Sequence, residues 1–113
     1  LEDVRTVLDR NIMTCILCCR EVAPEMIARK AGWIVNIGSI GGLSGHTQEA
    51  IYSTAKAAVH EYTRCLAAQL RPHNVYANAI APGPIITPRT HRMSPGRCCG
   101  WTGASSCGRL RRR

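Results

Sequence analysis

Apolar residues recur every three or four positions over the first thirty residues of the chain. The recurring positions are Val4, Leu8, Ile12, Cys15, Ile16, Cys19, Val22 and Ala23. This spacing places them on one face of a helix, so we predict a helix over residues 2–30. Pro24 is expected to kink or interrupt it, because proline lacks a backbone N–H and clashes with the preceding turn. Ala31-Gly32 is expected to end it.

Two short apolar runs follow, separated by a second helical pattern. Residues 33–37 and 75–81 predict strands, and residues 49–70 predict an alanine-rich helix between them. The first run is mostly apolar and rich in β-branched residues, so we expect it to be buried on both faces of a sheet. A helix of about twenty residues between two strands favours a parallel pair. The order helix–strand–helix–strand predicts part of a layered α/β domain.

The composition changes after Thr87-Pro88. Residues 89–113 are rich in Arg, Gly, Ser and Cys without apolar periodicity, so we expect a disordered basic tail after a domain over residues 1–88. The domain carries eight basic and seven acidic side chains, whereas the tail carries seven arginines and no acid. Most of the net charge of +8 therefore belongs to the tail. The domain itself gives no indication of nucleic-acid binding.

Length and cysteine count limit the classes of protein that fit. A chain of 113 residues is too short for a complete two-half dinucleotide-binding sheet, which needs more than about 200 residues. No apolar run reaches the length of about 18 residues that a membrane span requires, and no secretory signal is visible. The odd number of cysteines, seven, then predicts reduced thiols and a cytoplasmic location. Cys15, Cys18 and Cys19 are expected together on one helix face as small buried side chains, with no metal site.

The candidate chemistry lies in Ser39, Tyr52 and Lys56. Tyr52 and Lys56 are one helical turn apart, so they share a face. An ammonium beside a phenol favours the phenolate, which makes Tyr52 a general acid or base near neutral pH. Ser39 follows the first predicted strand, at the carboxyl end where open α/β sheets bind ligands. Its hydroxyl can donate a hydrogen bond to a substrate carbonyl oxygen that gains negative charge.

Three segments resemble the short-chain dehydrogenase/reductase family. They are Trp-Ile-Val-Asn-Ile-Gly-Ser at 33–39, Tyr-Ser-Thr-Ala-Lys at 52–56 and Asn-Ala-Ile-Ala-Pro-Gly at 78–83. The resemblance covers residues 1–88, about the C-terminal half of that family's domain, and implies a partial Rossmann-like, doubly wound parallel sheet. It also implies an NAD(P)-dependent oxidoreductase that transfers hydride between the nicotinamide of NAD or NADP and a small-molecule carbonyl or alcohol.

The resemblance implies a role for each matched residue. Tyr52 would give a proton to the carbonyl or take one from the alcohol, and Lys56 would hold the nicotinamide ribose. Ser39 would orient and polarise the substrate oxygen, and Asn11 matches an asparagine that supports a proton relay through water. The loop that meets the nicotinamide carboxamide would include Pro82, Gly83, Ile85 and Thr87.

Several family features are absent from these residues. The glycines at 38, 41, 42 and 45 do not have the G-x-G-x-x-G spacing of a phosphate loop, and no residue that selects NAD or NADP is recognisable. We therefore expect this chain alone to bind cofactor poorly and to show no measurable turnover. The tail after Pro88 does not resemble the family, and a shifted reading frame is our leading explanation for it.

Two alternatives stay open beside the enzyme. In the family, the helices that correspond to residues 2–30 and 49–70 pack against a partner subunit. The chain is therefore expected to form a homo-oligomer, and it could be a non-catalytic association fragment. Nucleic-acid binding through the tail is the weaker alternative, because no folded platform or interleaved aromatic residues accompany the arginines.

Overall fold

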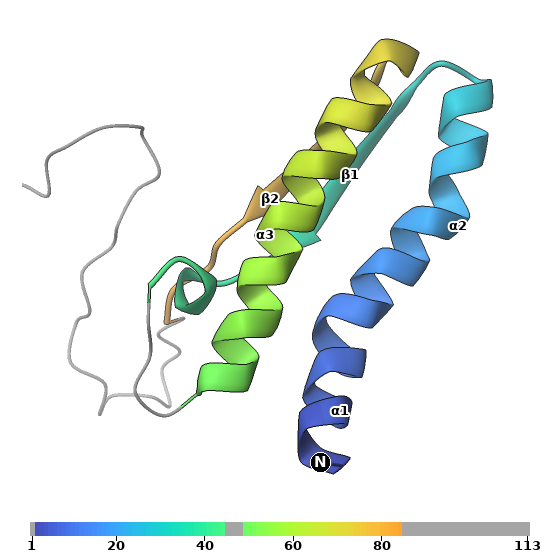
Figure 1. Ribbon diagram of the computed structural model, residues 1–113. Helices are drawn as coiled ribbons and strands as arrows, with labels where there is room; N and C mark the ends of the chain where they lie inside the picture. Colours follow the sequence, from blue (N-terminus) through green and yellow to red (C-terminus); the bar gives the residue numbers. More distant parts are fainter. Residues whose placement is uncertain (1, 45–48, 85–113) are drawn as a thin grey trace, which may run out of the picture. The chain divides into compact units, whose positions relative to one another are not determined.

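The computed structural model describes residues 2–44 and 49–84, and its first compact unit spans Leu1–Gly83. Its helices are α1 (Glu2–Leu8), the π-helix η1 (Asp9–Met13), α2 (Thr14–Ala28), the 3-10 helix η2 (Ile40–Gly42), α3 (Ala50–Leu70) and the 3-10 helix η3 (Arg71–His73). Its strands are β1 (Gly32–Ile37) and β2 (Val75–Ile80). Figure 1 shows α1, η1 and α2 as one long rod beside α3. The predicted order of helix, strand, helix and strand is confirmed, whereas the predicted tail lies outside the described residues.

The first long helix is irregular at a place that the sequence did not indicate. α2 runs through Pro24 to Ala28, so the expected interruption at Pro24 is wrong. Ala23 and Met26 pack against the core, and this burial offsets the hydrogen bond that proline removes. The irregularity is instead the π-helical turn η1, where the Thr14 N–H donates to the Asp9 carbonyl five residues earlier.

α2 ends at a left-handed residue that is not glycine. Lys30 has a φ of 52°, and its N–H donates to the Ile27 carbonyl at 3.1 Å. The Ala31 N–H donates to the Met26 carbonyl at 3.2 Å, which completes a Schellman motif. The helix therefore stops before the predicted Ala31-Gly32, and Gly32 is already the first residue of β1.

The two strands pair in parallel, as predicted, with Gly32 opposite Val75 and Ile37 opposite Ile80. Alternate residues of each strand face the helices and are buried, as the alternating burial along β1 shows. The main cluster of buried side chains joins these strands to α2 and α3. It consists of Cys19, Ile34, Leu66, Leu70, Val75 and Ala77.

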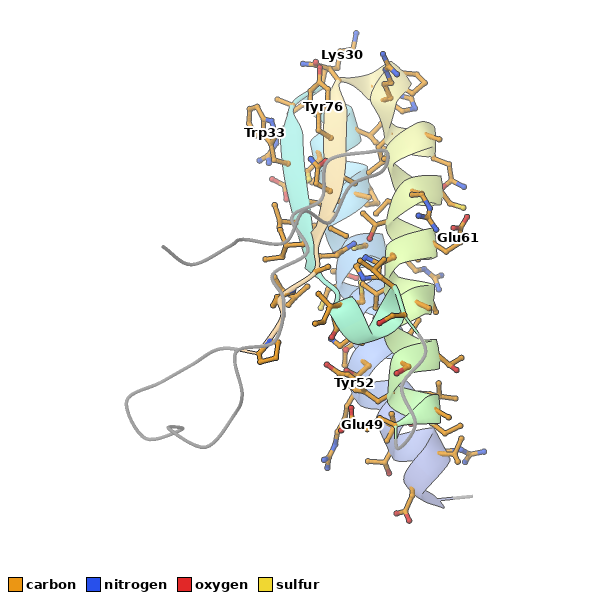
Figure 2. The ribbon with its side chains drawn as sticks, turned by 90° about the vertical axis from the view of Figure 1, so that its left-hand side faces the viewer. Lys30, Trp33, Glu49, Tyr52, Glu61 and Tyr76 are labelled. Carbon is orange, nitrogen blue, oxygen red and sulfur yellow. The ribbon has the colours of Figure 1, made fainter. Side chains whose placement is uncertain are left out.

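The opposite face of the sheet is apolar and exposed. Trp33 is 73% exposed, and Figure 2 shows its side chain directed away from the helices. The other exposed large apolar residues of this face are Val35, Ile37, Tyr76 and Ile80. The expectation that the first strand is buried on both faces is therefore wrong for the described residues. An apolar strand shows what a sheet can bury, but burial also needs a second covering layer, and residues 2–44 and 49–84 supply only one.

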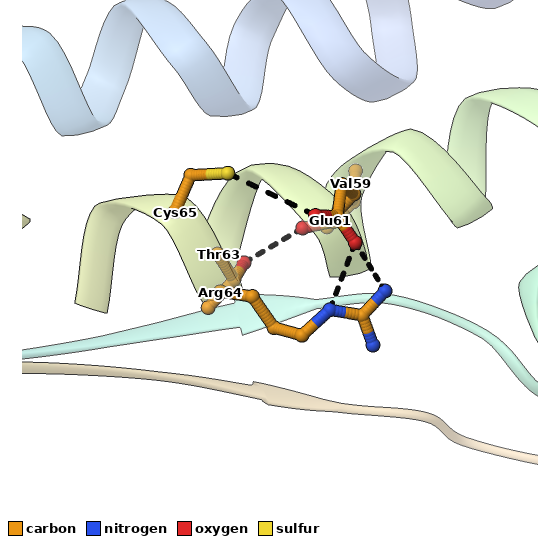
Figure 3. Close-up of polar contacts among 5 residues, drawn as sticks. All are labelled: Val59, Glu61, Thr63, Arg64 and Cys65. Carbon is orange, nitrogen blue, oxygen red and sulfur yellow. Dashed lines mark hydrogen bonds and ion pairs between the residues drawn. The ribbon is translucent and has the colours of Figure 1, made fainter. Parts of the chain in front are cut away.

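A buried polar group connects the sheet to both long helices. Asn36 donates from its Nδ2 to the Thr63 Oγ1 on α3 at 2.9 Å, and its Oδ1 lies 3.5 Å from the Cys19 Sγ on α2. The Thr63 hydroxyl in turn donates to the Val59 carbonyl at 2.7 Å (Figure 3). Asn36 thus has a structural role, because its side chain joins β1 to side chains of α2 and α3. Each polar atom is satisfied, which removes most of the cost of burying it.

Candidate active site

Ser39 lies two residues after the end of β1, at the carboxyl end of the strand. Its backbone is extended, and its Oγ accepts a hydrogen bond from the Gly41 N–H at 3.1 Å. Because the oxygen is held as an acceptor, the hydroxyl proton can be donated to another group. The Ile40 N–H donates to the Pro82 carbonyl at 3.1 Å, so the Ser39 loop lies beside the segment that follows β2.

Tyr52 and Lys56 lie on the first turns of α3 and share a face, as their spacing predicts. The Lys56 Nζ donates to the carbonyl of Ile37 at 3.0 Å, at the end of β1. The same Nζ lies 5.7 Å from the centre of the Tyr52 ring, within the range of a cation–π interaction. One of the three ammonium protons is thus used by the protein, which leaves the others for a ligand.

Gly41 shows how closely the candidate residues gather. A Cβ at this position would lie 3.4 Å from the Ser39 Oγ and 3.8 Å from the Tyr52 Cε1. The side chains of Ser39 and Tyr52 therefore border one small space at the end of β1. Tyr52 also lines an open hollow of about 650 Å³ together with Val7, Glu49, Ala50 and Ile51. Figure 2 shows Tyr52 and Glu49 near each other at the start of α3.

Gly42 permits the close contact between this loop and α3. A Cβ at Gly42 would lie 2.6 Å from the backbone atoms Lys56 C and Ala57 N. No side chain fits there without moving the loop or the helix, because backbone atoms cannot rotate away. Sequence reasoning did not single out Gly42, since its glycine requirement comes from the approach of a segment distant along the chain.

Asn11 is placed in the π-helical turn η1, which packs against α3. Its Nδ2 donates to the carbonyl of Val7 at 2.8 Å, within its own helix. The structure gives no hydrogen bond from Asn11 to Tyr52 or Lys56, so its role in a proton relay stays a prediction. π-helical turns are frequent at functional sites, which agrees with that prediction without testing it.

The predicted cofactor-binding residues are described only in part. Pro82 and Gly83 lie beside Ile40, since the Pro82 carbonyl accepts its N–H and a Cβ at Gly83 would lie 3.4 Å from its Cδ1. Ile85 and Thr87 lie outside the described residues. The structure therefore brings Ser39, Tyr52, Lys56, Pro82 and Gly83 to one edge of the sheet.

The three neighbouring cysteines differ in burial. Cys19 is buried, Cys15 is half-buried and Cys18 is exposed, so the expectation that all three share one buried face is wrong for Cys18. Cys18 and Cys19 are consecutive, so their side chains project about 100° apart around the helix, and only Cys15 and Cys19 face the core. Over residues 2–44 and 49–84, no group of three potential ligands could hold a metal ion. In the same ranges, no helix is long and apolar enough to cross a membrane.

Burial raises the pKa of the Cys15 thiol to about 11, and the neighbouring Cys19 adds to this effect. The Lys56 ammonium acts in the opposite direction, which places it within electrostatic reach of α2. Burial also raises the pKa of Tyr62, with Cys19 and Cys15 as further causes. The space between α2 and α3 thus favours neutral groups, with Lys56 at its border.

The Cys15 thiol is expected to make stability fall at alkaline pH. Its pKa is about 11 in the folded chain against 9.0 for an unperturbed thiol, so the folded state holds the proton more tightly. The contribution is complete below about pH 9 and is lost as the pH rises towards about 11. Urea unfolding over this range should show a shallower decline for Cys15→Ala than for the parent. Cys18→Ala is the control, and an equal flattening in that variant would contradict the assignment.

Comparisons with known proteins agree with this geometry. The profile of the short chain dehydrogenase family matches residues 1–97. A 3-oxoacyl-[acyl-carrier-protein] reductase from Synechocystis sp. is 39% identical over 94 residues, which are 83% of this chain and 38% of that protein. The chain spans between 28% and 39% of the length of the curated relatives that it matches.

Solved structures share the fold. An acetoin dehydrogenase from Enterobacter cloacae matches 79% of this chain and 37% of its own length, with a TM-score of 0.74 and 32% identity. A 3-oxoacyl-[acyl-carrier protein] reductase with bound NAD from Brucella melitensis matches 77% of this chain and 34% of its own, with a TM-score of 0.69 and 35% identity. The parallel strand pair with α2 and α3 packed on one face therefore has the Rossmann-like fold of these proteins.

Proposed function

Because the chain belongs to the short-chain dehydrogenase family, we propose that residues 1–88 form the catalytic part of an NAD(P)-dependent oxidoreductase for a small carbonyl or alcohol. The observation that carries this proposal is the convergence of Ser39, Tyr52 and Lys56 at the carboxyl end of β1. The substrate class and the cofactor belong to the proposal, since the chain matches only part of each relative.

The chain's own residues supply proton transfer and orientation. The Ser39 hydroxyl donates a hydrogen bond to the substrate carbonyl oxygen, and the Tyr52 phenol gives that oxygen its proton. The Lys56 ammonium stabilises the phenolate that remains. When NADH or NADPH is bound, it supplies the hydride that reduces the carbonyl carbon.

The described residues fit one end of the cofactor. The Lys56 ammonium has donors left for the ribose hydroxyls after its bond to the Ile37 carbonyl. Pro82 and Gly83 lie on the same side of the sheet, where the nicotinamide carboxamide would be held. No glycine-rich phosphate loop occurs in residues 2–44 or 49–84, and no described residue distinguishes NAD from NADP.

The purified 113-residue chain is expected to oxidise neither NADH nor NADPH measurably with carbonyl substrates. The reason is that its described residues bind only the nicotinamide end, which leaves most of the cofactor's binding energy unused. The absorbance of the reduced nicotinamide measures the rate, with Tyr52→Phe as the control. Turnover by the parent chain that disappears in Tyr52→Phe would overturn this expectation and still support the proposed chemistry.

A non-catalytic association fragment is the second candidate, and exposed apolar side chains favour it. Leu17 on α2 is 54% exposed, and Met13 lies one turn before it and is also exposed. These positions belong to the helix that we expect to meet a partner copy. The free, exposed thiols of Cys18 and Cys65 are consistent with a reducing compartment such as the cytoplasm, which we keep as the proposed location.

Leu17→Glu is expected to shift the chain from oligomer towards monomer in sedimentation velocity, because it places a charge on the apolar part of α2. Arg20→Gln on the same helix lowers the net charge by the same one unit and is the control for that change. Trp33→Glu tests the exposed face of the sheet as the competing contact. Loss of association only in Trp33→Glu would contradict the assignment of the interface to the helices.

A further inference from the structure

His60 is a buried titratable residue to which the proposed chemistry gives no role. It lies one helical turn after Lys56 on α3 and is 8% exposed. Tyr52, Lys56 and His60 follow each other at intervals of four residues and so lie along one face of the helix. Lys56 contacts the carbonyl of Ile37, and His60 contacts the backbone of Ser39.

The imidazole meets both backbone polar groups of Ser39. The His60 Nε2 lies 3.3 Å from the Ser39 nitrogen and 3.0 Å from its carbonyl oxygen. The carbonyl already accepts from the Gly42 N–H at 3.0 Å. Within residues 2–44 and 49–84, the Ser39 N–H donates to the His60 Nε2 and to no other acceptor. A half-buried backbone N–H needs such a partner, so we assign the ring the tautomer with its proton on Nδ1.

Gly38 leaves room for the same ring because it has no side chain. A Cβ at Gly38 would lie 2.2 Å from the His60 Cε1 and 2.5 Å from its Nε2. The imidazole therefore fills the space that any side chain at position 38 would need. The ring touches the backbone immediately before Ser39 and bonds the backbone of Ser39 itself.

The amides on either side of Ser39 have different acceptors. The Gly38 N–H donates to the Ile80 carbonyl at 2.8 Å, and the Ile40 N–H donates to the Pro82 carbonyl at 3.1 Å. These bonds continue the pairing with β2, and the Ser39 N–H points away from β2 towards α3. Of these three residues, Ser39 is the one whose N–H bonds α3, and His60 is its partner there.

We propose that His60 is a positioning residue for Ser39. Its Nε2 fixes the Ser39 backbone against α3, in register with Lys56, and so determines where the Ser39 hydroxyl points at the end of β1. The consequence for catalysis rests on the proposed function, whereas the contact does not. A test of the contact alone therefore separates the failure of this proposal from the failure of the oxidoreductase assignment.

Amide hydrogen exchange in the full chain tests the contact, with the parent, His60→Leu and His60→Gln. Leucine keeps the volume and loses the acceptor, whereas glutamine places an amide oxygen within reach of the Ser39 N–H. In His60→Leu we expect exchange at Ser39 to become about 10-fold faster, the loss of one hydrogen bond. Gly38 and Ile40 should change much less, and glutamine should restore most of the protection at Ser39.

The flanking amides separate positioning from general stability. If exchange at Gly38, Ser39 and Ile40 accelerates equally, His60 only stabilises the fold and the proposal is wrong. Unchanged exchange at Ser39 in His60→Leu also overturns it. The parent chain gives a test that needs no variant, because long-range proton–nitrogen NMR identifies the tautomer. A proton on Nδ1 supports the proposal, and a proton on Nε2 overturns it.

Discussion

Replacing Tyr52 by phenylalanine is expected to lower kcat/KM for carbonyl reduction about 1000-fold in a complete domain that carries this chain's residues. Such a domain is a chimera in which residues 1–88 replace the matching segment of the Synechocystis reductase, with which the chain shares 39% identity over 94 residues. Phenylalanine keeps the ring beside Lys56 and Gly41 and removes only the hydroxyl that gives the proton. The rate of NADH or NADPH oxidation measures the effect.

Tyr62→Phe is the matched control for Tyr52→Phe. Tyr62 lies on the same helix and packs against the core, away from the Ser39 loop. Tyr62→Phe should leave kcat/KM within about threefold of the value for the unsubstituted chimera, because Tyr62 touches no reacting group. A loss below 10-fold for Tyr52→Phe, or similar losses in both variants, would contradict the role of Tyr52 as proton donor.

Gly42→Ala is expected to lower the free energy of unfolding of the chain by about 2–3 kcal/mol. The added Cβ would lie 2.6 Å from backbone atoms of Lys56 and Ala57, so the Ser39 loop and α3 must separate. The same separation should weaken the contact between the Lys56 ammonium and the Ile37 carbonyl. Urea unfolding followed by circular dichroism measures the change.

Gly41→Ala is the matched control for Gly42→Ala. The nearest atoms to a Cβ at Gly41 lie at 3.4 Å or more, which is ordinary van der Waals contact, and the backbone there needs no positive φ. Its effect should stay below about 1 kcal/mol. Equal destabilisation by the two substitutions would show that the loop does not depend on the close approach at Gly42.

Local spacing along the chain was sufficient to predict much of the fold and the centre of the site. The spacing of apolar residues predicted both long helices and both strands, because the repeat of a helix or a strand is visible within a few neighbouring residues. Tyr52 and Lys56 share a face for the same reason. Ser39 could be placed because it lies two residues after a strand, and parallel strands place their carboxyl ends at one edge.

Features that depend on packing between distant segments were not predictable from the sequence. His60 and Gly42 matter only because the Ser39 loop approaches α3. A histidine in a helix or a glycine in a loop is too common to indicate such a contact from the sequence. The π-helical turn at Asp9–Met13 and the left-handed Lys30 have no local residue signal, since neither contains glycine or proline. The exposure of Trp33 and Tyr76 was not predicted either. An apolar pattern shows that a strand face can be buried, but it does not identify the segment that would cover that face.

Carbonyl reduction by the chimera is the measurement that tests the central claim most directly. If Ser39, Tyr52 and Lys56 form a proton-transfer site, the chimera should oxidise NADH or NADPH with the 3-oxoacyl substrate of its parent reductase. Ser39→Ala and Tyr52→Phe should each abolish most of that activity, and the isolated chain should show none. A chimera that folds, as judged by circular dichroism, and binds the cofactor yet reduces no substrate would contradict the claim.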